Sequence, residues 1–315
     1  MPTTQLSTIL SIVSPAFILI VLGYLTVKFA WLDKRGVRAL GWFTTRVALP
    51  AAIFQALSSR NFADIFHADY LIVYGVGSLI AYFTVFIVAK SMFKKPLTES
   101  AFYGLGSSMS NTILIGYPII IQIFGPAAVI PFALTLIIEN LVILPLSLAL
   151  AESGMRKEGH FLKALVGSLG TLAKNPIILS IAMGLLFSLL SISLPSAADS
   201  AIQSLAATAS GLAQYTIGGI LAGVALTVLS KDMSLVILGK LIIHPAAILL
   251  MIFMLPPMDP MFTSIAVILS CLPMFSVYAV LAMDYELGEF CSAVLLPTTV
   301  LSFITISLAI WFQAA

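Results

Sequence analysis

Long apolar segments recur along this chain, and they constrain its fold more than any other feature. They fall at residues 7–27, 37–57, 69–92, 99–124, 127–151, 176–194, 199–229, 234–255, 260–283 and 289–312. Several exceed the ~20 residues that a helix needs to cross a bilayer. Only 9% of residues are charged, against about 25% in soluble domains, so much of the surface must face lipid. We predict an all-α integral membrane protein with ten transmembrane helices.

The positive charges predict the orientation of these helices. Thirteen of the 15 lysines and arginines fall in or beside alternate connections, and Arg46 and Arg60 are the two exceptions. By the positive-inside rule those connections are cytoplasmic. We therefore expect a multi-pass protein of the plasma (cell inner) membrane with both termini outside. No basic residue precedes Lys28, so the first apolar segment is expected to be a helix rather than a secretory signal.

The segments divide into two sets of five around a basic linker. We expect a first five-helix repeat over residues 1–151, a cytoplasmic linker with an amphipathic helix over 152–175, and a second repeat over 176–315. An odd number of spans in each half gives the halves opposite orientations. Such inverted repeats place a binding site near the middle of the membrane.

The fourth and ninth segments occupy equivalent places in the two halves, and each contains a proline beside polar or small residues. Proline removes a backbone donor and clashes with the preceding turn, so we expect both helices to be broken there. A broken helix exposes an N-terminus whose partial positive charge favours a carboxylate. Simple kinks are the alternative, as at Pro50, Pro145, Pro245 and Pro297. The candidate substrate-binding residues are Ser110, Asn111, Thr112, Gly116, Tyr117, Pro118, Cys271, Leu272, Pro273 and Ser276.

Four further polar residues within the apolar segments are candidates for substrate binding or ion coupling: Arg46, Glu139, Asn140 and His244. Arg46 and Glu139 could form a structural ion pair; alternatively, Arg46 approaches the substrate and Glu139 carries coupling protons. His244 is either a packing residue or a proton relay.

Other polar and small residues in the apolar segments have structural interpretations. Lys240 is expected to extend to the inner interface. Gln214 and Tyr215 could form hydrogen bonds between helices, and Gly218, Gly219 and Gly223 predict close helix packing or a dimer surface.

At these residues the sequence resembles the auxin efflux carrier family. The resemblance rests on Asn111-Thr112, Gly116, Pro118 and Gly125, and on Leu272-Pro273, Ala279, Ala282 and Tyr285; Leu49-Pro50 and Asn175-Pro176 also fit. It implies two inverted five-helix repeats in a sodium/proton antiporter-like fold, with helices 4 and 9 crossing at their breaks. It further implies a scaffold of spans 1, 2, 6 and 7, elevator-type movement of the remaining spans, carboxylate transport and a homodimer. The short linker resembles the bacterial malonate and malate permease branch, which favours dicarboxylates.

Other functions stay open or are disfavoured. An exporter of auxin-like aromatic carboxylates, a channel and a ligand sensor remain alternatives. Enzyme signatures such as G-x-S-x-G and H-E-x-x-H do not occur, and neither do metal-ligand clusters or nucleotide-binding loops, so no cofactor or metal is expected. The net charge of +2 and the absence of a basic patch argue against nucleic acid as a partner. A proton-linked or uncoupled anion carrier is the leading interpretation.

Overall fold

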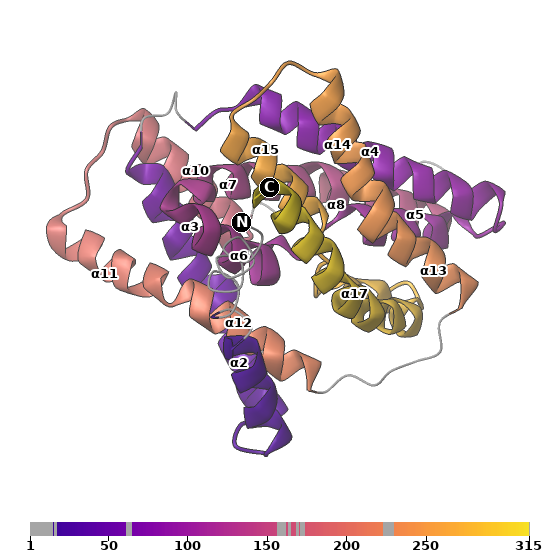
Figure 1. The fold of residues 1–315 in the computed structure, drawn as a ribbon, viewed down its shortest axis with the longest axis horizontal. Coiled ribbons are helices and arrows are strands. Elements are labelled where there is room, and N and C mark those ends of the chain that lie inside the picture. Colours follow the sequence, from indigo (N-terminus) through magenta and orange to yellow (C-terminus); the bar gives the residue numbers. More distant parts are fainter. Residues whose placement is uncertain are drawn as a thin grey trace.

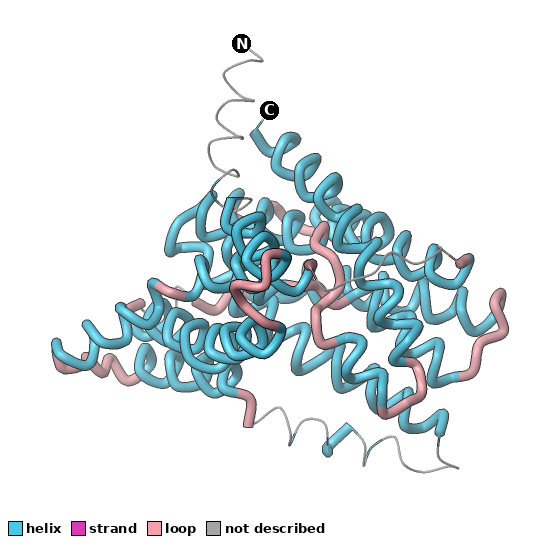
Figure 2. The backbone as a smooth tube through the Cα atoms, turned by 90° about the horizontal axis from the view of Figure 1, so that it is seen from below, coloured by secondary structure: helices cyan, strands magenta, loops and turns pink. Residues whose placement is uncertain are grey.

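The computed structural model describes residues 18–60, 65–155, 174–222 and 230–314, with isolated positions at 15, 162, 165–167 and 170. Helices dominate this part of the chain, and loops are confined to the connections (Figure 2). Four stretches within it are long and apolar enough to cross a membrane: Ala68–Ser91, Thr112–Met155, Lys231–Met254 and Gly288–Phe312. Shorter apolar helices span Ile18–Lys28, Pro176–Leu189 and Pro260–Ser270. The chain is thus an all-α membrane protein; ten spans in an inverted repeat remain a prediction.

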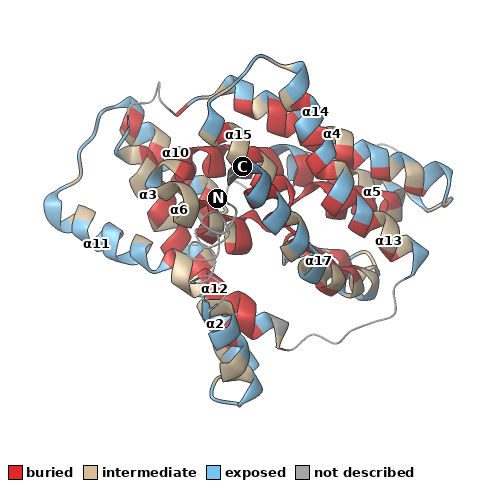
Figure 3. Ribbon diagram, in the orientation of Figure 1, coloured by how far each residue is buried: buried red, intermediate tan, exposed pale blue. Residues whose placement is uncertain are grey.

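One group of helices occupies the left and lower parts of Figure 1. In this group α3 packs against α10 and α11, and α2 packs against α12. Its elements are α2 (Lys34–Phe43), α3 (Leu49–Ser58), α10 (Pro176–Leu189), α11 (Ser196–Ala207) and α12 (Ala209–Leu221). The expected seventh span is divided at Thr208 into α11 and α12. No residue of α11 is buried, which suits a helix on the outside of the molecule (Figure 3).

The other helices form a second group, in which α4 packs against α5 and α14, and α5 also packs against α8; α4, α5, α13 and α14 lie on the right of Figure 1. Its elements are α4 (Ala68–Ser91), α5 (Leu97–Ser108), α7 (Val129–Ile138), α8 (Leu144–Met155), α13 (Lys231–Leu238), α14 (His244–Met254) and α17 (Gly288–Ala314). The second group also contains α6 (Tyr117–Phe124), α15 (Pro260–Ser270) and α16 (Tyr278–Met283), and α6 and α15 lie near the middle of Figure 1. The groups meet where α12 packs against α6 and where α3 packs against α7.

Both expected helix breaks are present, and they contact each other. After α5 the backbone is extended at Met109, and helical structure resumes with Thr112. After α15 the chain is non-helical from Leu272 until α16 begins. The Asn111 N–H donates to the Pro273 carbonyl at 2.8 Å, within an isolated antiparallel bridge between Ser110 and Met274.

The position of the first break differs from the expectation. We predicted unwinding at Pro118, but the break lies about two turns earlier. Pro118 is instead in the first turn of α6, directly after the π-helical turn Thr112–Gly116, whose wider geometry accommodates the missing N–H. The polar residues Ser110 and Asn111 occupy the break, whereas Pro273 does lie in the second break.

Four π-helical turns occur in the described chain, and each directly precedes a helix with proline in its second position. The turns are Thr44–Ala48, Thr112–Gly116, Glu139–Ile143 and Gly239–Ile243. The prolines after them are Pro50, Pro118, Pro145 and Pro245. A π-helical turn is wider than an α-helical turn and so makes room for the proline ring. It also accommodates the backbone carbonyl one turn earlier, which receives no hydrogen bond because proline has no N–H. Three of the prolines expected as kinks therefore come after widened turns, whereas Pro297 lies inside α17.

Small residues set the closest helix contacts. A Cβ at Gly218 would meet the Ile20 carbonyl, and a Cβ at Gly219 would lie 2.7 Å from Val37. The Tyr215 hydroxyl donates to Thr26 Oγ1 at 2.8 Å. The expected small-residue face thus packs α12 closely against Ile18–Lys28 and α2.

Several expectations fall outside the described residues. They are the start of the first span (residues 7–14, 16 and 17), most of the amphipathic linker helix and Gly223. Within the described chain, Gly125 ends α6 with φ +69°, a backbone conformation that favours glycine.

Candidate functional site

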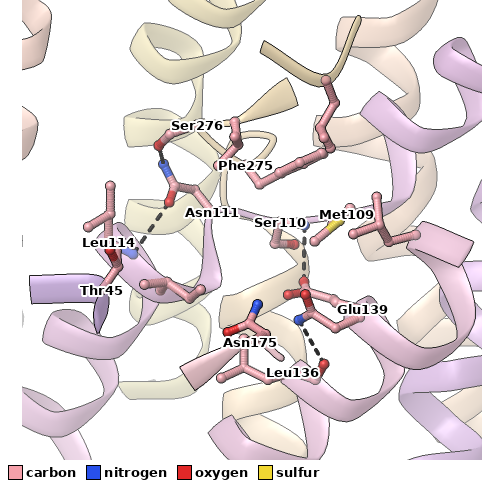
Figure 4. Close-up of a pocket in the computed structure, with 15 residues that line it drawn as sticks. Thr45, Met109, Ser110, Asn111, Leu114, Leu136, Glu139, Asn175, Phe275 and Ser276 are labelled. Atoms are coloured by element: carbon pink, nitrogen blue, oxygen red, sulfur yellow. Dashed lines mark hydrogen bonds between the residues drawn. The ribbon is translucent and has the colours of Figure 1, made fainter. Parts of the chain in front are cut away.

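A cavity of about 240 Å³ lies at the meeting of the two helix groups. Thr45 and Asn175 come from the group that contains α2, α3 and α10, and the other polar residues come from the breaks and the turn before α8 (Figure 4). Apolar walls include Met109, Leu136 and Phe275. The polar lining consists of Thr45, Ser110, Asn111, Glu139, Asn140, Asn175 and Ser276.

The Asn111 side chain joins the two breaks. Its oxygen accepts from the Leu114 N–H at 3.4 Å and so caps the turn that begins at Thr112. Its nitrogen donates to Ser276 Oγ at 2.7 Å. These two bonds fix the amide at the cavity wall, as Figure 4 shows. The expectation that Asn111 and Ser276 share one site is consistent with this geometry.

Glu139 is buried beside the first break and lines the cavity. Its Oε1 accepts from the Ser110 N–H at 3.0 Å, from Thr112 Oγ1 at 2.8 Å and from the Tyr74 hydroxyl at 3.4 Å. A carboxylate in this position compensates the partial positive charge at the start of the helical segment after the break. Asn140 also lines the cavity, and its amide donates to the Leu136 carbonyl at 2.9 Å.

Lys240 is fully buried, so the expectation that it reaches the inner interface is wrong. Its ammonium donates to Ser110 Oγ and the Ser270 carbonyl, each at 2.9 Å, and contacts His244 Nδ1 at 2.8 Å. Lys240 lies nine residues after the start of α13 at Lys231, about 13 Å along the helix. Because Ser270 ends α15, the ammonium compensates the partial negative charge of that helix end.

His244 extends this network toward α4. Its Nε2 lies 2.9 Å from Ser78 Oγ, and its ring is fully buried. The residue is thus a satisfied buried histidine in contact with Lys240, rather than a residue of the cavity wall.

Arg46 is not part of the network. It is exposed on the turn that precedes α3, whereas Glu139 is only 1% exposed and bonds to α4 and the first break. The alternative of an Arg46–Glu139 ion pair is therefore wrong. Its neighbour Thr45, which the sequence did not indicate, lines the cavity instead.

The remaining candidates hold the breaks together. A Cβ at Gly116 would lie 2.7 Å from Leu269 and 2.8 Å from Leu272, so the two segments approach closely there. The Tyr117 ring packs against Phe132, and the Cys271 carbonyl accepts from Thr305 Oγ1 at 2.8 Å. The cavity wall does not include Thr112, Gly116, Tyr117, Pro118, Cys271, Leu272 or Pro273.

Sequence reasoning missed the residues that complete the buried network: Tyr74, Ser78, Lys240 and Ser270. One signal was available, because Lys240 precedes His244 by four residues and such pairs share a helix face. Tyr74 and Ser78 have the same spacing on α4, but nothing in the sequence pairs those two helices.

Comparisons with known proteins cover nearly the whole chain. A family model described as "Membrane transport protein" matches residues 8–311. A Rhizobium meliloti (strain 1021) protein named "Putative malonate transporter" is 28% identical over 304 residues, which cover 95% of this chain and 94% of that protein. An Escherichia coli (strain K12) protein named "Uncharacterized transporter YfdV" is 24% identical over 242 residues, 75% of this chain and 76% of the relative. The cavity and its network lie inside the region that the family model matches.

Proposed function

This chain belongs to the membrane transport protein family, as the resemblance to auxin efflux carriers indicated, and is a multi-pass membrane transporter; from that premise we propose that it is a secondary carrier of small organic anions. The observation that carries the proposal is the cavity at the contact of the two helix breaks. Helix N-termini and amide or hydroxyl donors are suited to a carboxylate. Asn111 and Ser276 supply such donors at the cavity wall.

A dicarboxylate such as malonate or malate is the proposed substrate class. The cavity volume of about 240 Å³ is below the ~300–1,000 Å³ of sites for drug-sized ligands. This volume favours a small dicarboxylate over an indole acid. The relative named for malonate, which aligns over nearly its full length, supports the same class.

The proposed mechanism is alternating access by an elevator movement. Helices of spans 1, 2, 6 and 7 would form the scaffold, and the group with both breaks would carry the substrate across it. The cavity has walls from both groups, so relative movement would change its access. Asn175 in its wall comes directly after Lys174 of the basic linker, which favours an inward-facing state under the orientation with both termini outside the plasma membrane.

The remaining architectural proposals extend this scheme. They comprise ten helices in two inverted repeats, 1–151 and 176–315, joined by the linker 152–175, with two copies forming a homodimer.

Uptake by reconstituted protein tests the function. We expect saturable uptake of labelled malonate or malate into proteoliposomes, acceleration by unlabelled substrate on the opposite side, and loss of uptake in Asn111→Ala. Gln203→Ala is the matched control, because Gln203 is exposed on α11 and bonds to Asp199. Competition by indole-3-acetate alone would favour an aromatic substrate. Non-saturable flux would favour a channel, and binding without uptake would favour a sensor.

A further inference from the structure

Two opposite charges meet at one residue of the first break. The Ser110 N–H donates to Glu139, and the Ser110 hydroxyl accepts from the Lys240 ammonium. Glu139 and Lys240 come from two π-helical turns far apart in the sequence. Any change in the charge of one residue is therefore transmitted to the other through a short, buried connection.

Three hydrogen-bond acceptors surround the Lys240 ammonium. An ammonium has three donors, and here Ser110 Oγ, the Ser270 carbonyl and His244 Nδ1 provide three acceptors at 2.8–2.9 Å. The Ser270 carbonyl can only accept, and it lies at the negative end of α15. These partners hold the ammonium behind the cavity wall, since Lys240 does not line the cavity itself.

Among the described residues, the hydrogen bonds to Glu139 all reach one of its two oxygens. The donors from Ser110, Thr112 and Tyr74 all reach Oε1. Within the described part of the chain, Oε2 makes none of the hydrogen bonds found. Because Glu139 lines the cavity, Oε2 is the atom at which a proton from the cavity can be received.

The charge balance makes anion binding depend on that proton. When Glu139 is ionised it neutralises Lys240, and an entering anion meets a carboxylate in the cavity wall. When Oε2 holds a proton, the repulsion is removed and the charge of Lys240 is no longer compensated. The other titratable groups that face the pair are Tyr70 and Tyr74 on α4, His244 on α14 and Cys271 after α15.

From this geometry we propose that Glu139 and Lys240 form a coupling pair: each anion binds together with a proton on Glu139, and Lys240 supplies the positive charge that the proton releases. The inference rests on the proposed function and adds how anion binding at that same site is coupled to a proton. It predicts a proton-linked anion carrier, because the loaded site moves the anion and the proton together.

Malonate binding to the purified protein measured across pH tests the coupling pair. At pH values where Glu139 is ionised in the free protein, wild type should bind more tightly as pH falls, by about tenfold per pH unit, and should take up about one proton per bound malonate from weakly buffered solution. Glu139→Gln mimics the protonated residue, so it should bind malonate independently of pH and without proton uptake. In proteoliposomes this variant should keep malonate exchange but lose acceleration by an inward proton gradient.

Variants at Lys240 test the second residue of the coupling pair. Lys240→Met should weaken malonate binding about tenfold or more at every pH, since it removes a charged partner, whereas Lys240→Arg should retain pH-dependent binding. If Lys240→Met does not fold, the double variant Glu139→Gln/Lys240→Met restores neutrality and should fold without binding malonate. Glu99→Gln and Lys90→Met are matched controls, because Glu99 pairs with Lys95 outside the site and Lys90 is exposed.

The outcomes separate the coupling pair from the function itself. If folded wild type binds and transports no small carboxylate, the proposed function fails. If wild type binds malonate but Glu139→Gln keeps the same pH profile, or folded Glu139→Gln loses binding at every pH, the coupling pair is overturned while the function stands. Unchanged affinity in folded Lys240→Met would also overturn it.

Discussion

At the scale of single residues, Asn111 combines two roles that most polar side chains perform separately. It caps a helical segment and it bonds across the break to Ser276. Both bonds are made in a region where water cannot easily replace a lost partner, because Asn111 is only 8% exposed. Its substitution should therefore cost more than the loss of either bond alone.

Asn111→Ala and Ser276→Ala should differ in stability. Asn111→Ala removes the cap and the cross-break bond and should lower the free energy of unfolding by about 2 kcal/mol. Ser276→Ala removes only the second bond and should cost about 1 kcal/mol. Chemical unfolding of the detergent-solubilised protein measures both. Equal losses would mean that the cap contributes nothing.

Of the seven polar residues in the cavity wall, all except Thr45 and Asn175 were among the candidates from the sequence. Asn111, Ser276 and Glu139 could be identified because polar residues in apolar segments are conspicuous. Lys240 was misplaced because its distance from the membrane surface depends on where α13 begins, and the apolar run starts later than the helix does. The link from Lys240 to Ser110 spans 130 positions, and no local pattern encodes such a contact.

At the scale of elements, the two breaks depend on close approach at Gly116. The methyl group of alanine would lie 2.7 Å from Leu269 and 2.8 Å from Leu272. Both leucines are fully buried, so they have little room to move. The crossing is therefore held by packing as well as by the bond between Asn111 and Pro273.

Gly116→Ala should lower the free energy of unfolding by about 1–3 kcal/mol, the usual cost of overpacking, and should reduce malonate uptake. Gly211→Ala is the matched control: nothing lies within 4 Å of its Cβ position in α12. Alanine also favours a helix by about 1 kcal/mol relative to glycine, so that variant should be unchanged or more stable. Equal effects at both positions would argue against close packing at Gly116. Thermal unfolding in detergent provides the comparison.

Packing of α12 gives a second prediction at this scale. Gly218→Val should separate α12 from the helix Ile18–Lys28, because even a single Cβ would meet the Ile20 carbonyl. We expect a loss of folded protein measured by size-exclusion chromatography, while Gly211→Val should remain soluble and monodisperse. The sequence indicated this small-residue face but left open whether another helix or a second copy covers it.

At the scale of the whole molecule, the chain folds as two helix groups with the cavity between them. The apolar helices could be predicted, because hydrophobic length is set by the bilayer, whereas most of the expected linker 152–175 lies outside the described residues. The division of the seventh segment at Thr208 could not be predicted, since residues 199–222 read as one apolar run without proline. Tertiary contacts of α11 with α3 and of α12 with α2 decide that division.

Cysteine labelling tests the shared cavity. Thr45→Cys and Ser276→Cys place thiols in its wall on opposite groups, so malonate should protect both from a maleimide reagent. Ser59→Cys should be labelled without protection, because Ser59 is exposed at the end of α3. The native chain provides a low background, since Cys271 and Cys291 are buried. Protection at only one of the two wall positions would contradict a substrate site between the groups.

The four π-helical turns also bear on how the length of this chain can vary. A π-helical turn contains one residue more than an α-helical turn, so deleting one residue there would restore α-helical geometry and leave the next helical segment facing much the same way, while the residues of the widened turn itself would change position. Glu139 and Lys240 lie within two of these turns, Glu139–Ile143 and Gly239–Ile243, so a deletion there would change the position of Glu139 or Lys240 relative to Ser110. Insertions and deletions should therefore be confined to the surface connections, and each of these turns should keep a constant spacing from the proline after it.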